Sequence, residues 1–202
     1  TMTRSDLEKD LELDLTGITL VVTYHPVTAA THNTEDEINN LLEAMRAFPE
    51  ATVVFTLPNA DPENRVVADA LRLAVEGVEK WHLFASLGAR RYLSLISQAS
   101  AVVGNSSSGI LEAPALGTPT VNVGPRQDGR RMAQSVLSCG TNRSDIEATI
   151  RVALSSEFRE AFEGMENPYG SPGATNRVLQ ILEETAFGSL GPKKYYDPPF
   201  GK

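Results

Sequence analysis

Residues 101–114 read Ala-Val-Val-Gly-Asn-Ser-Ser-Ser-Gly-Ile-Leu-Glu-Ala-Pro, and this stretch decides the predicted fold. It begins as a short apolar run typical of a strand, breaks at a polar turn between Gly104 and Gly109, and resumes as a helix-forming segment. A loop that leads into a helix favours the binding of anions, because the first N–H groups of the helix have no partners within the helix and the macrodipole adds positive potential there. The serines add hydroxyl donors, and the glycines would let the backbone approach a ligand. We predict a phosphate site for a nucleoside diphosphate, with a plain serine N-cap as the open alternative.

Strand-like and helix-like segments alternate along the chain on both sides of this stretch. Strands are predicted at residues 18–24, 52–57, 81–84, 101–103 and 118–123, with a last short one at 136–137. Helices with apolar residues at helical spacing are predicted around residues 7–11, 38–48, 66–74 and 87–96. The alternation predicts an α/β fold with a Rossmann-like parallel sheet flanked by helices.

Capping boxes predict where three helices begin, because the first residue accepts a bond from the N–H three residues on and a Glu there bonds back. The boxes are Ser5 with Glu8, Thr34 with Glu37, and Ser144 with Glu147. From about residue 143 the chain is predicted to be mostly helical, with helices around 144–154, 159–165 and 178–182, and a proline-rich tail at 191–202. We predict a single nucleotide-binding domain over residues 1–202 that includes these helices and the tail.

Composition and charge exclude several classes of partner. The formal net charge of −8 would repel a phosphate backbone or an anionic membrane, so neither nucleic acid nor membrane is expected as a partner. Cys139 is the single cysteine, which forbids an internal disulfide and is typical of a reducing compartment, so a cytoplasmic location is expected. The three histidines are dispersed without metal-ligand spacing, and no metal or other cofactor is predicted.

Polar or aromatic residues follow the predicted strands where each strand ends. In parallel sheets wrapped by helices, ligands bind outside the carboxyl ends of the strands. The residues at or just after the carboxyl ends of the predicted strands are His25, Asn59, Phe84, residues 105–109 and Arg126. Their convergence favours a ligand site more than any single motif does.

Several of these motifs, taken together, match one enzyme family. They are Thr-Tyr-His-Pro-Val-Thr at 23–28, Leu-Pro-Asn-Ala-Asp at 57–61, the glycine-bounded run at 104–130, and Asn-Pro-Tyr-Gly at 167–170. Over nearly all of its length the chain resembles the C-terminal half of UDP-N-acetylglucosamine 2-epimerases, especially the hydrolysing kind that releases N-acetylmannosamine and UDP. The long run is specific in combination, whereas the histidine motif alone would be weak.

The resemblance implies a glycosyltransferase-B-type fold, in which two Rossmann-like domains enclose the active site between them. This chain provides one such domain, and the family's N-terminal half, with the carboxylates used for acid–base work, has no counterpart in it. We therefore expect a C-terminal domain whose partner is the missing N-terminal domain, and which is catalytically inactive by itself. The full-length enzyme is expected to be a homo-oligomer.

The resemblance also implies which residues bind the substrate, UDP or a UDP-amino-sugar. Ser106 and Ser107 match the family's diphosphate loop, Asn105 is assigned with them, and Arg126 can offer a bidentate fork to phosphate. Glu112 lies about one turn beyond the loop and can accept both ribose hydroxyls. The alternative for Glu112 is a helix-terminus acid favoured by the dipole.

Three candidates lie at other strand ends. His25 is the predicted catalytic residue, since an imidazole with a pKa near neutrality can assist the departing UDP; a structural histidine before Pro26 is the alternative. Asn59 could hydrogen-bond the substrate or cap the next helix. Phe84 could pack near the uracil or be a buried core residue.

The predicted function is therefore UDP binding within a UDP-N-acetylglucosamine 2-epimerase. The resemblance implies anti elimination of UDP to a glycal, followed by water addition with inverted C2 stereochemistry. A non-hydrolysing epimerase domain, a stand-alone nucleotide-binding module and a glycosyltransferase domain are the alternatives. The exact amino-sugar is not fixed, because sugar contacts would be shared with the missing half.

Overall fold

A computed structural model describes residues 1–27, 33–58, 64–189 and 191–192. The chain divides into two compact units, Thr1–Tyr169 and Gly170–Lys202. The first unit contains the sheet and the candidate site, and the second contains helix α8 (Ala174–Glu184) and a short 3-10 helix at Phe187–Ser189. The single-domain organisation of residues 1–202 stays a prediction.

The sheet has six parallel strands in the order β3-β2-β1-β4-β5-β6. The strands are β1 (Thr19–Thr23), β2 (Thr52–Thr56), β3 (Trp81–Phe84), β4 (Ala101–Gly104), β5 (Thr120–Val123) and β6 (Val136–Cys139). The predicted α/β class is confirmed, and β3 begins and ends where the sequence predicted. Since chain order reverses between β1 and β4, the switch point lies between these two central strands, where such sheets bind ligands.

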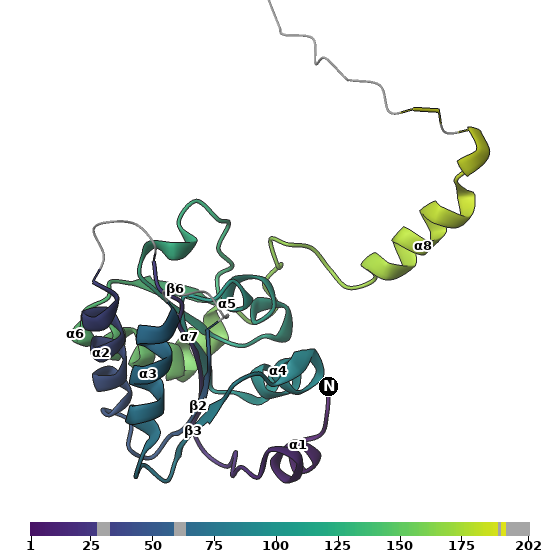
Figure 1. Cartoon of the computed structure of the whole chain (residues 1–202). Coiled ribbons are helices and arrows are strands. Elements are labelled where there is room, and N and C mark those ends of the chain that lie inside the picture. The colour runs from purple at the N-terminus through teal and green to yellow at the C-terminus, as the bar shows by residue number, and fades with distance from the viewer. Residues whose placement is uncertain (28–32, 59–63, 190, 193–202) are drawn as a thin grey trace, which may run out of the picture. The chain divides into compact units, whose positions relative to one another are not determined.

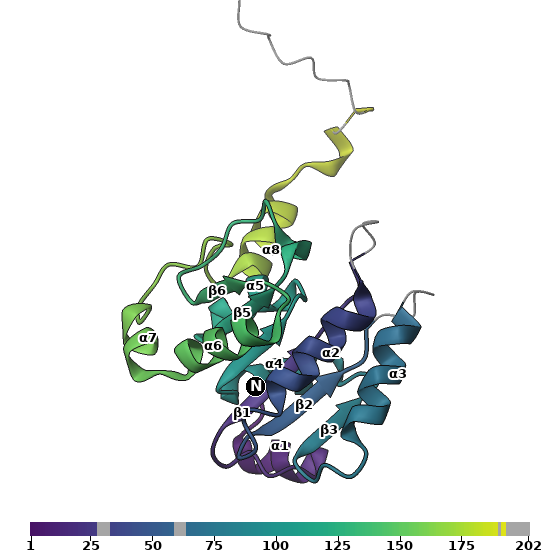
Figure 2. The same ribbon diagram turned by 90° about the vertical axis from the view of Figure 1, so that its left-hand side faces the viewer.

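Helices cover both faces of the sheet. In the first unit they are α1 (Arg4–Leu11), α2 (Thr34–Met45), α3 (Asn64–Val75), α4 (Gly88–Gln98), α5 (Ser108–Leu111), α6 (Arg143–Leu154) and α7 (Ser156–Ala161). Helices α2, α3 and α6 lie on one face, with α1 and α4 on the other (Figure 1). Figure 2 looks onto the first face, with α2, α3 and α6 in front of the strands.

The two faces of the sheet bury separate hydrophobic clusters. Successive strand residues point to opposite faces, so Leu20 and Val22 join the cluster under α2, α3 and α6, while Val21 joins the cluster under α1 and α4. All five residues of β1 are buried, and its middle three are Leu or Val, as is typical of a central parallel strand.

The three predicted capping boxes are wrong, although each helix forms. Thr3 caps α1 by accepting from the Asp6 N–H, and Asn33 caps α2 by accepting from the Glu35 and Asp36 N–H groups. Helix α6 begins after Asn142, which makes no side-chain capping bond. In each case the N-cap residue lies one or two residues before the predicted box, so the predicted capping serines and threonine lie inside the helix.

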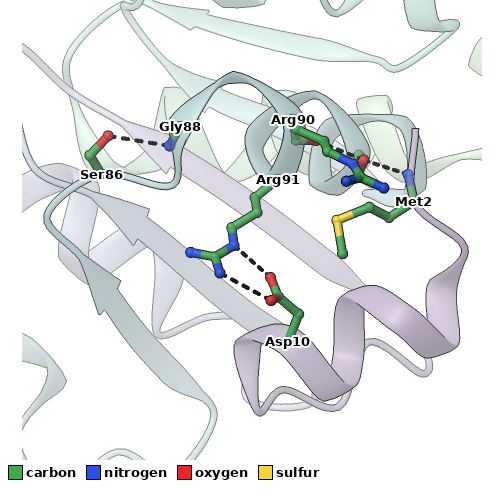
Figure 3. A network of polar contacts seen from close by, with 7 residues as sticks. Met2, Asp10, Ser86, Gly88, Arg90 and Arg91 are labelled. Atoms are coloured by element: carbon green, nitrogen blue, oxygen red, sulfur yellow. Dashed lines mark hydrogen bonds and ion pairs between the residues drawn. The ribbon is translucent and has the colours of Figure 1, made fainter.

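Helix α1 is fastened to α4 by the polar contacts of Figure 3. The Met2 N–H donates to Ser94 Oγ (2.7 Å), and the Arg91 guanidinium donates to both Asp10 carboxylate oxygens (2.5 and 3.0 Å). At the start of α4, the Gly88 N–H donates to Ser86 Oγ (3.3 Å). These contacts fix α4, whose first turns border the candidate site.

In the second unit, α8 carries an exposed apolar stripe of Val178, Leu179, Ile181 and Leu182. None of the described helices is long and apolar enough to cross a membrane.

Candidate functional site

A pocket of about 890 Å³ lies at the carboxyl edge of the sheet, around the switch point. Its walls come from the ends of β1, β2 and β4 and from the first turns of α3 and α4. The residues used below that line it are Thr23, His25, Thr56, Tyr92, Ser106 and Ser108. Of the segments predicted to meet at this edge, His25 and the loop at residues 105–109 line the pocket.

Asn105 ties the loop after β4 to the loop after β1. Its side-chain amide accepts from the His25 N–H and donates to the His25 carbonyl, both at 2.7 Å, and the residue is fully buried. The Asn105 carbonyl in turn accepts from Arg126 Nη1 (3.0 Å) and Gln127 Nε2 (2.8 Å), which follow β5. Asn105 was predicted as a UDP contact, and its side chain is occupied in holding His25. Gln127 is a member of this cluster that the sequence analysis missed.

The three serines are arranged differently from one another. Ser106 and Ser108 line the pocket, and Ser107 is the residue that precedes α5. The Ser108 N–H donates to Ser106 Oγ (3.4 Å). In the part of the chain that the structure describes, the N–H groups of Ser106 and Ser107 have no hydrogen-bond partner, so both are available to an anion.

The helix after the loop is short: α5 begins at Ser108 and ends after a single turn at Leu111. Pro114 then opens a separate 3-10 helix, a position that tolerates its missing N–H. A four-residue helix has a small macrodipole, so anion binding here would depend on the individual N–H and hydroxyl groups.

Gly104 and Gly109 are required by packing within the protein. A Cβ on Gly104 would lie 2.1 Å from the Thr23 carbonyl oxygen, and one on Gly109 would lie 2.7 Å from a methyl of Thr120. Both glycines therefore allow close packing against the neighbouring strands. That they also let the backbone approach a ligand stays a prediction.

His25 and Phe84 are placed by the structure, whereas Asn59 lies outside the described residues. His25 is half-buried, lines the pocket and is held through its backbone by Asn105. Phe84 is partly buried, packs against the cluster under α1 and α4, and does not line the pocket; its contact with uracil stays a prediction.

The two remaining charged candidates flank the serine loop. Burial, and secondarily the charge of Arg130, lowers the pKa of Arg126, whose guanidinium nevertheless stays protonated at neutral pH. Glu112 follows the last residue of α5 and is exposed. Neither residue lines the pocket, so a ligand would have to extend beyond it along the loop to meet them.

A row of four hydroxyls lines the pocket and was not predicted. Thr56 and Thr23 are register partners at the ends of β2 and β1, with their Oγ1 atoms 2.6 Å apart. Tyr92 Oη on α4 lies 3.5 Å from Thr23 Oγ1 and 2.6 Å from Ser108 Oγ. No local pattern could have revealed this row, because its members come from four separate elements.

Nothing in the described part of the chain forms a group of three or more metal-ligating side chains. The pocket's polar lining consists of hydroxyl side chains, His25 and Asn64, together with Arg65 and Arg72 on α3. Both arginines are paired with Asp69. Such a site suits a polar, anionic small molecule.

Comparison with known proteins identifies the family. The family model for UDP-N-acetylglucosamine 2-epimerase matches residues 2–183. The chain is 35% identical over 198 residues to the GDP/UDP-N,N'-diacetylbacillosamine 2-epimerase (hydrolyzing) of Campylobacter jejuni, covering 97% of this chain and 51% of that protein. It is 30% identical over 173 residues to the UDP-N-acetylglucosamine 2-epimerase of Neisseria meningitidis, covering 86% and 45%. The chain spans about half the length of the curated relatives it matches.

Solved structures share the fold. The Neisseria meningitidis UDP-GlcNAc 2-epimerase bound to UDP-GlcNAc aligns with a TM-score of 0.65 at 19% identity, covering 90% of this chain and 48% of that one. A putative UDP-N-acetylglucosamine 2-epimerase from Listeria monocytogenes aligns with a TM-score of 0.67 at 20% identity, covering 98% and 52%. With the match of the family model to most of its residues, the chain belongs to the UDP-N-acetylglucosamine 2-epimerase family.

Proposed function

We propose that this chain forms the UDP-binding part of a UDP-N-acetylglucosamine 2-epimerase. The observation that carries the proposal is the pocket at the switch point between β1 and β4, lined by His25 and Ser106. The serine loop beside it presents two N–H groups without partners among the described residues. A relative of the same fold was solved with UDP-GlcNAc bound, which supports the same class of ligand for this chain.

Within this proposal, each flanking residue has a defined task. The diphosphate lies against Ser106 and Ser107, with Arg126 supplying positive charge from the neighbouring loop. Glu112 accepts the ribose hydroxyls from beyond the loop. His25 acts at the leaving group, held in place by Asn105, whose own contribution is to position both loops.

Calorimetric titration of the chain with UDP tests the proposal. A Ser107→Ala, Glu112→Ala double variant removes one proposed contact to the diphosphate and one to the ribose. Each lost hydrogen bond is worth about 1 kcal/mol or more, so binding should weaken at least about tenfold. The matched control is Ser144→Ala with Glu157→Ala, two exposed residues on α6 and α7, which should bind as the wild type does. A folded wild-type chain that binds no UDP would overturn the proposal.

We also propose that the parent enzyme hydrolyses its substrate, releasing the free amino-sugar and UDP. Relatives from Campylobacter jejuni and Legionella pneumophila, both named hydrolyzing, support this outcome. Product analysis of the longer protein decides it, because a non-hydrolysing enzyme would release only the UDP-linked epimer. The chain by itself should not turn over UDP-N-acetylglucosamine, and turnover by the pure chain would refute that part.

A further inference from the structure

The motif Asn-Pro-Tyr-Gly at residues 167–170 has no task in the proposed function. It stands where the first unit ends, since the second unit begins at Gly170. The Asn167 side-chain carbonyl accepts from the Tyr169 N–H (3.0 Å), and the ring of Pro168 between them fixes its φ. The motif is therefore a turn that holds the backbone of Tyr169.

Tyr169 contacts the loop that follows β5, 38 positions earlier in the chain. Its hydroxyl donates to the Arg131 carbonyl (3.0 Å). This arginine loop (residues 125–132) opens with the 3-10 helix Pro125–Gln127, from which two side chains donate to the Asn105 carbonyl. Tyr169 thus bonds to the far end of the loop that carries Arg126, the proposed phosphate ligand.

The second half of the arginine loop has few other attachments. Residues 128–131 are exposed, and the backbone bonds from the N–H groups of Asp128 and Arg130 stay within the loop. Among the residues that the structure describes, the Tyr169 hydroxyl makes the only hydrogen bond between residues 128–132 and the chain outside the loop.

A loop that is bonded at both ends has fewer conformations than a loop that is bonded at one end. The first end is fixed where Gln127 donates to Asn105, and the second end is fixed where Tyr169 donates to Arg131. A loop ordered in this way before binding loses less conformational entropy on binding. Arg126 donates one of its five N–H groups to Asn105, which leaves the others for a ligand.

We infer that Tyr169 is a positioning residue, which holds the arginine loop in the conformation in which Arg126 meets the diphosphate. The inference rests on the proposed function, because it requires Arg126 to contact the ligand. Tyr169 does not line the pocket, so this task needs no contact between the tyrosine and the ligand.

The test is a double-mutant cycle with Tyr169→Phe and Arg126→Ala, measured by calorimetric titration of the chain with UDP. Tyr169→Phe keeps the ring and should weaken binding roughly fivefold, the cost of fixing the backbone of about one residue on binding. Arg126→Ala should weaken binding at least about tenfold, because it removes a charge-assisted contact. The double variant should bind no more weakly than Arg126→Ala, since the loop then has no contact left to position.

Hydrogen exchange of the chain without ligand separates positioning from folding. In Tyr169→Phe the amides of Asp128 and Arg130 should exchange faster, because the loop that pairs them has lost its second attachment. Amides of β1 and α6 should keep their wild-type rates. An equal acceleration throughout the chain would show that Tyr169 acts only in folding, and would overturn the inference.

The outcomes of the titration distinguish the inference from the proposed function. If the wild type binds UDP and Tyr169→Phe binds it equally well, or if the two losses multiply, the inference fails while the proposed function stands. If Arg126→Ala binds as the wild type does, the assignment of Arg126 fails and the inference fails with it. If the folded wild type binds no UDP, both fail.

Two further variants complete the test. Asn167→Ala removes the bond to the Tyr169 N–H and should weaken UDP binding in the same direction as Tyr169→Phe, so the result does not depend on one substitution. Thr149→Val is the matched control, because it removes a hydroxyl that donates to the Asp145 carbonyl on α6, outside the arginine loop. Its affinity for UDP should equal that of the wild type.

Discussion

Replacing Asn105 with Ala should destabilise the chain more than its single side chain suggests. The amide makes both of its bonds to the backbone of His25, a residue distant in sequence, so the substitution unfastens the loop after β1 from the loop after β4. Because the side chain is fully buried, its removal also leaves a small cavity at the switch point.

The size of the effect follows from the two bonds. A net intramolecular hydrogen bond contributes about 1 kcal/mol, and a buried backbone group left unpaired costs about 1–3 kcal/mol. Both His25 backbone groups lose this partner in Asn105→Ala, so we expect a loss of about 2–4 kcal/mol in the free energy of unfolding. For a chain of this length, that corresponds to a fall in Tm of roughly 4–16 °C.

Urea unfolding followed by circular dichroism measures this difference. Asn39→Ala on α2 is the matched control, because Asn39 is exposed and Ala has the higher helix propensity, so its stability should equal or slightly exceed that of the wild type. A stability of Asn105→Ala within about 0.5 kcal/mol of the wild type would show that the clamp on His25 contributes little, and would refute the reasoning.

Two further predictions concern the close packing at Gly104 and the buried thiol of Cys139. Gly104→Ala should lower the free energy of unfolding, measured in urea, by more than about 3 kcal/mol, because its Cβ would meet the Thr23 carbonyl oxygen. Gly117→Ala, also at positive φ but in open space, should lower it by only about 1 kcal/mol. Equal losses in the two variants would contradict this reasoning. Burial raises the pKa of Cys139 from 9.0 to about 11, so alkylation of the native thiol at pH 8 should be much slower than after unfolding. The thiol of the unfolded chain loses its proton near pH 9, and that of the native chain near pH 11. The stability contributed by the protonated thiol is therefore complete below pH 9 and is lost as the pH rises to about 11. Cys139→Ala should not show this loss of stability.

The sequence was sufficient for the fold because its strongest signals are local. Short apolar runs bounded by Pro, Gly or charged residues predicted all six strands, and β3 was located to the residue. Helix starts were missed because a Ser or Thr followed by Glu three residues on also occurs inside a first turn, as with Thr34 in α2. There Glu37 is buried and accepts from Tyr24 Oη (2.7 Å), a tertiary partner that no local pattern reveals.

The meeting of the site segments was predictable for a different reason. Parallel strands end at one edge of the sheet, so residues following β1, β4 and β5 had to lie near one another. The sequence could not predict which atoms would meet. Asn105 contacts His25, which lies 80 positions earlier in the chain. Tyr92 on α4 contacts Ser108 on α5, and strand β4 separates these helices in the sequence. Both contacts therefore depend on the packed structure.

These contacts bear on whether a nucleotide can bind to this chain by itself. Asn105 holds the loop after β1 through His25, and its carbonyl receives Arg126 and Gln127 from the loop after β5. Three loops at the carboxyl edge of the sheet are therefore fixed to one another by hydrogen bonds within the chain. A loop that is already ordered loses little conformational entropy on binding, which favours affinity. On this reasoning the serine loop should receive a diphosphate in the chain as it stands, and the loss of affinity in Asn105→Ala should exceed the loss in a variant that is equally destabilised elsewhere.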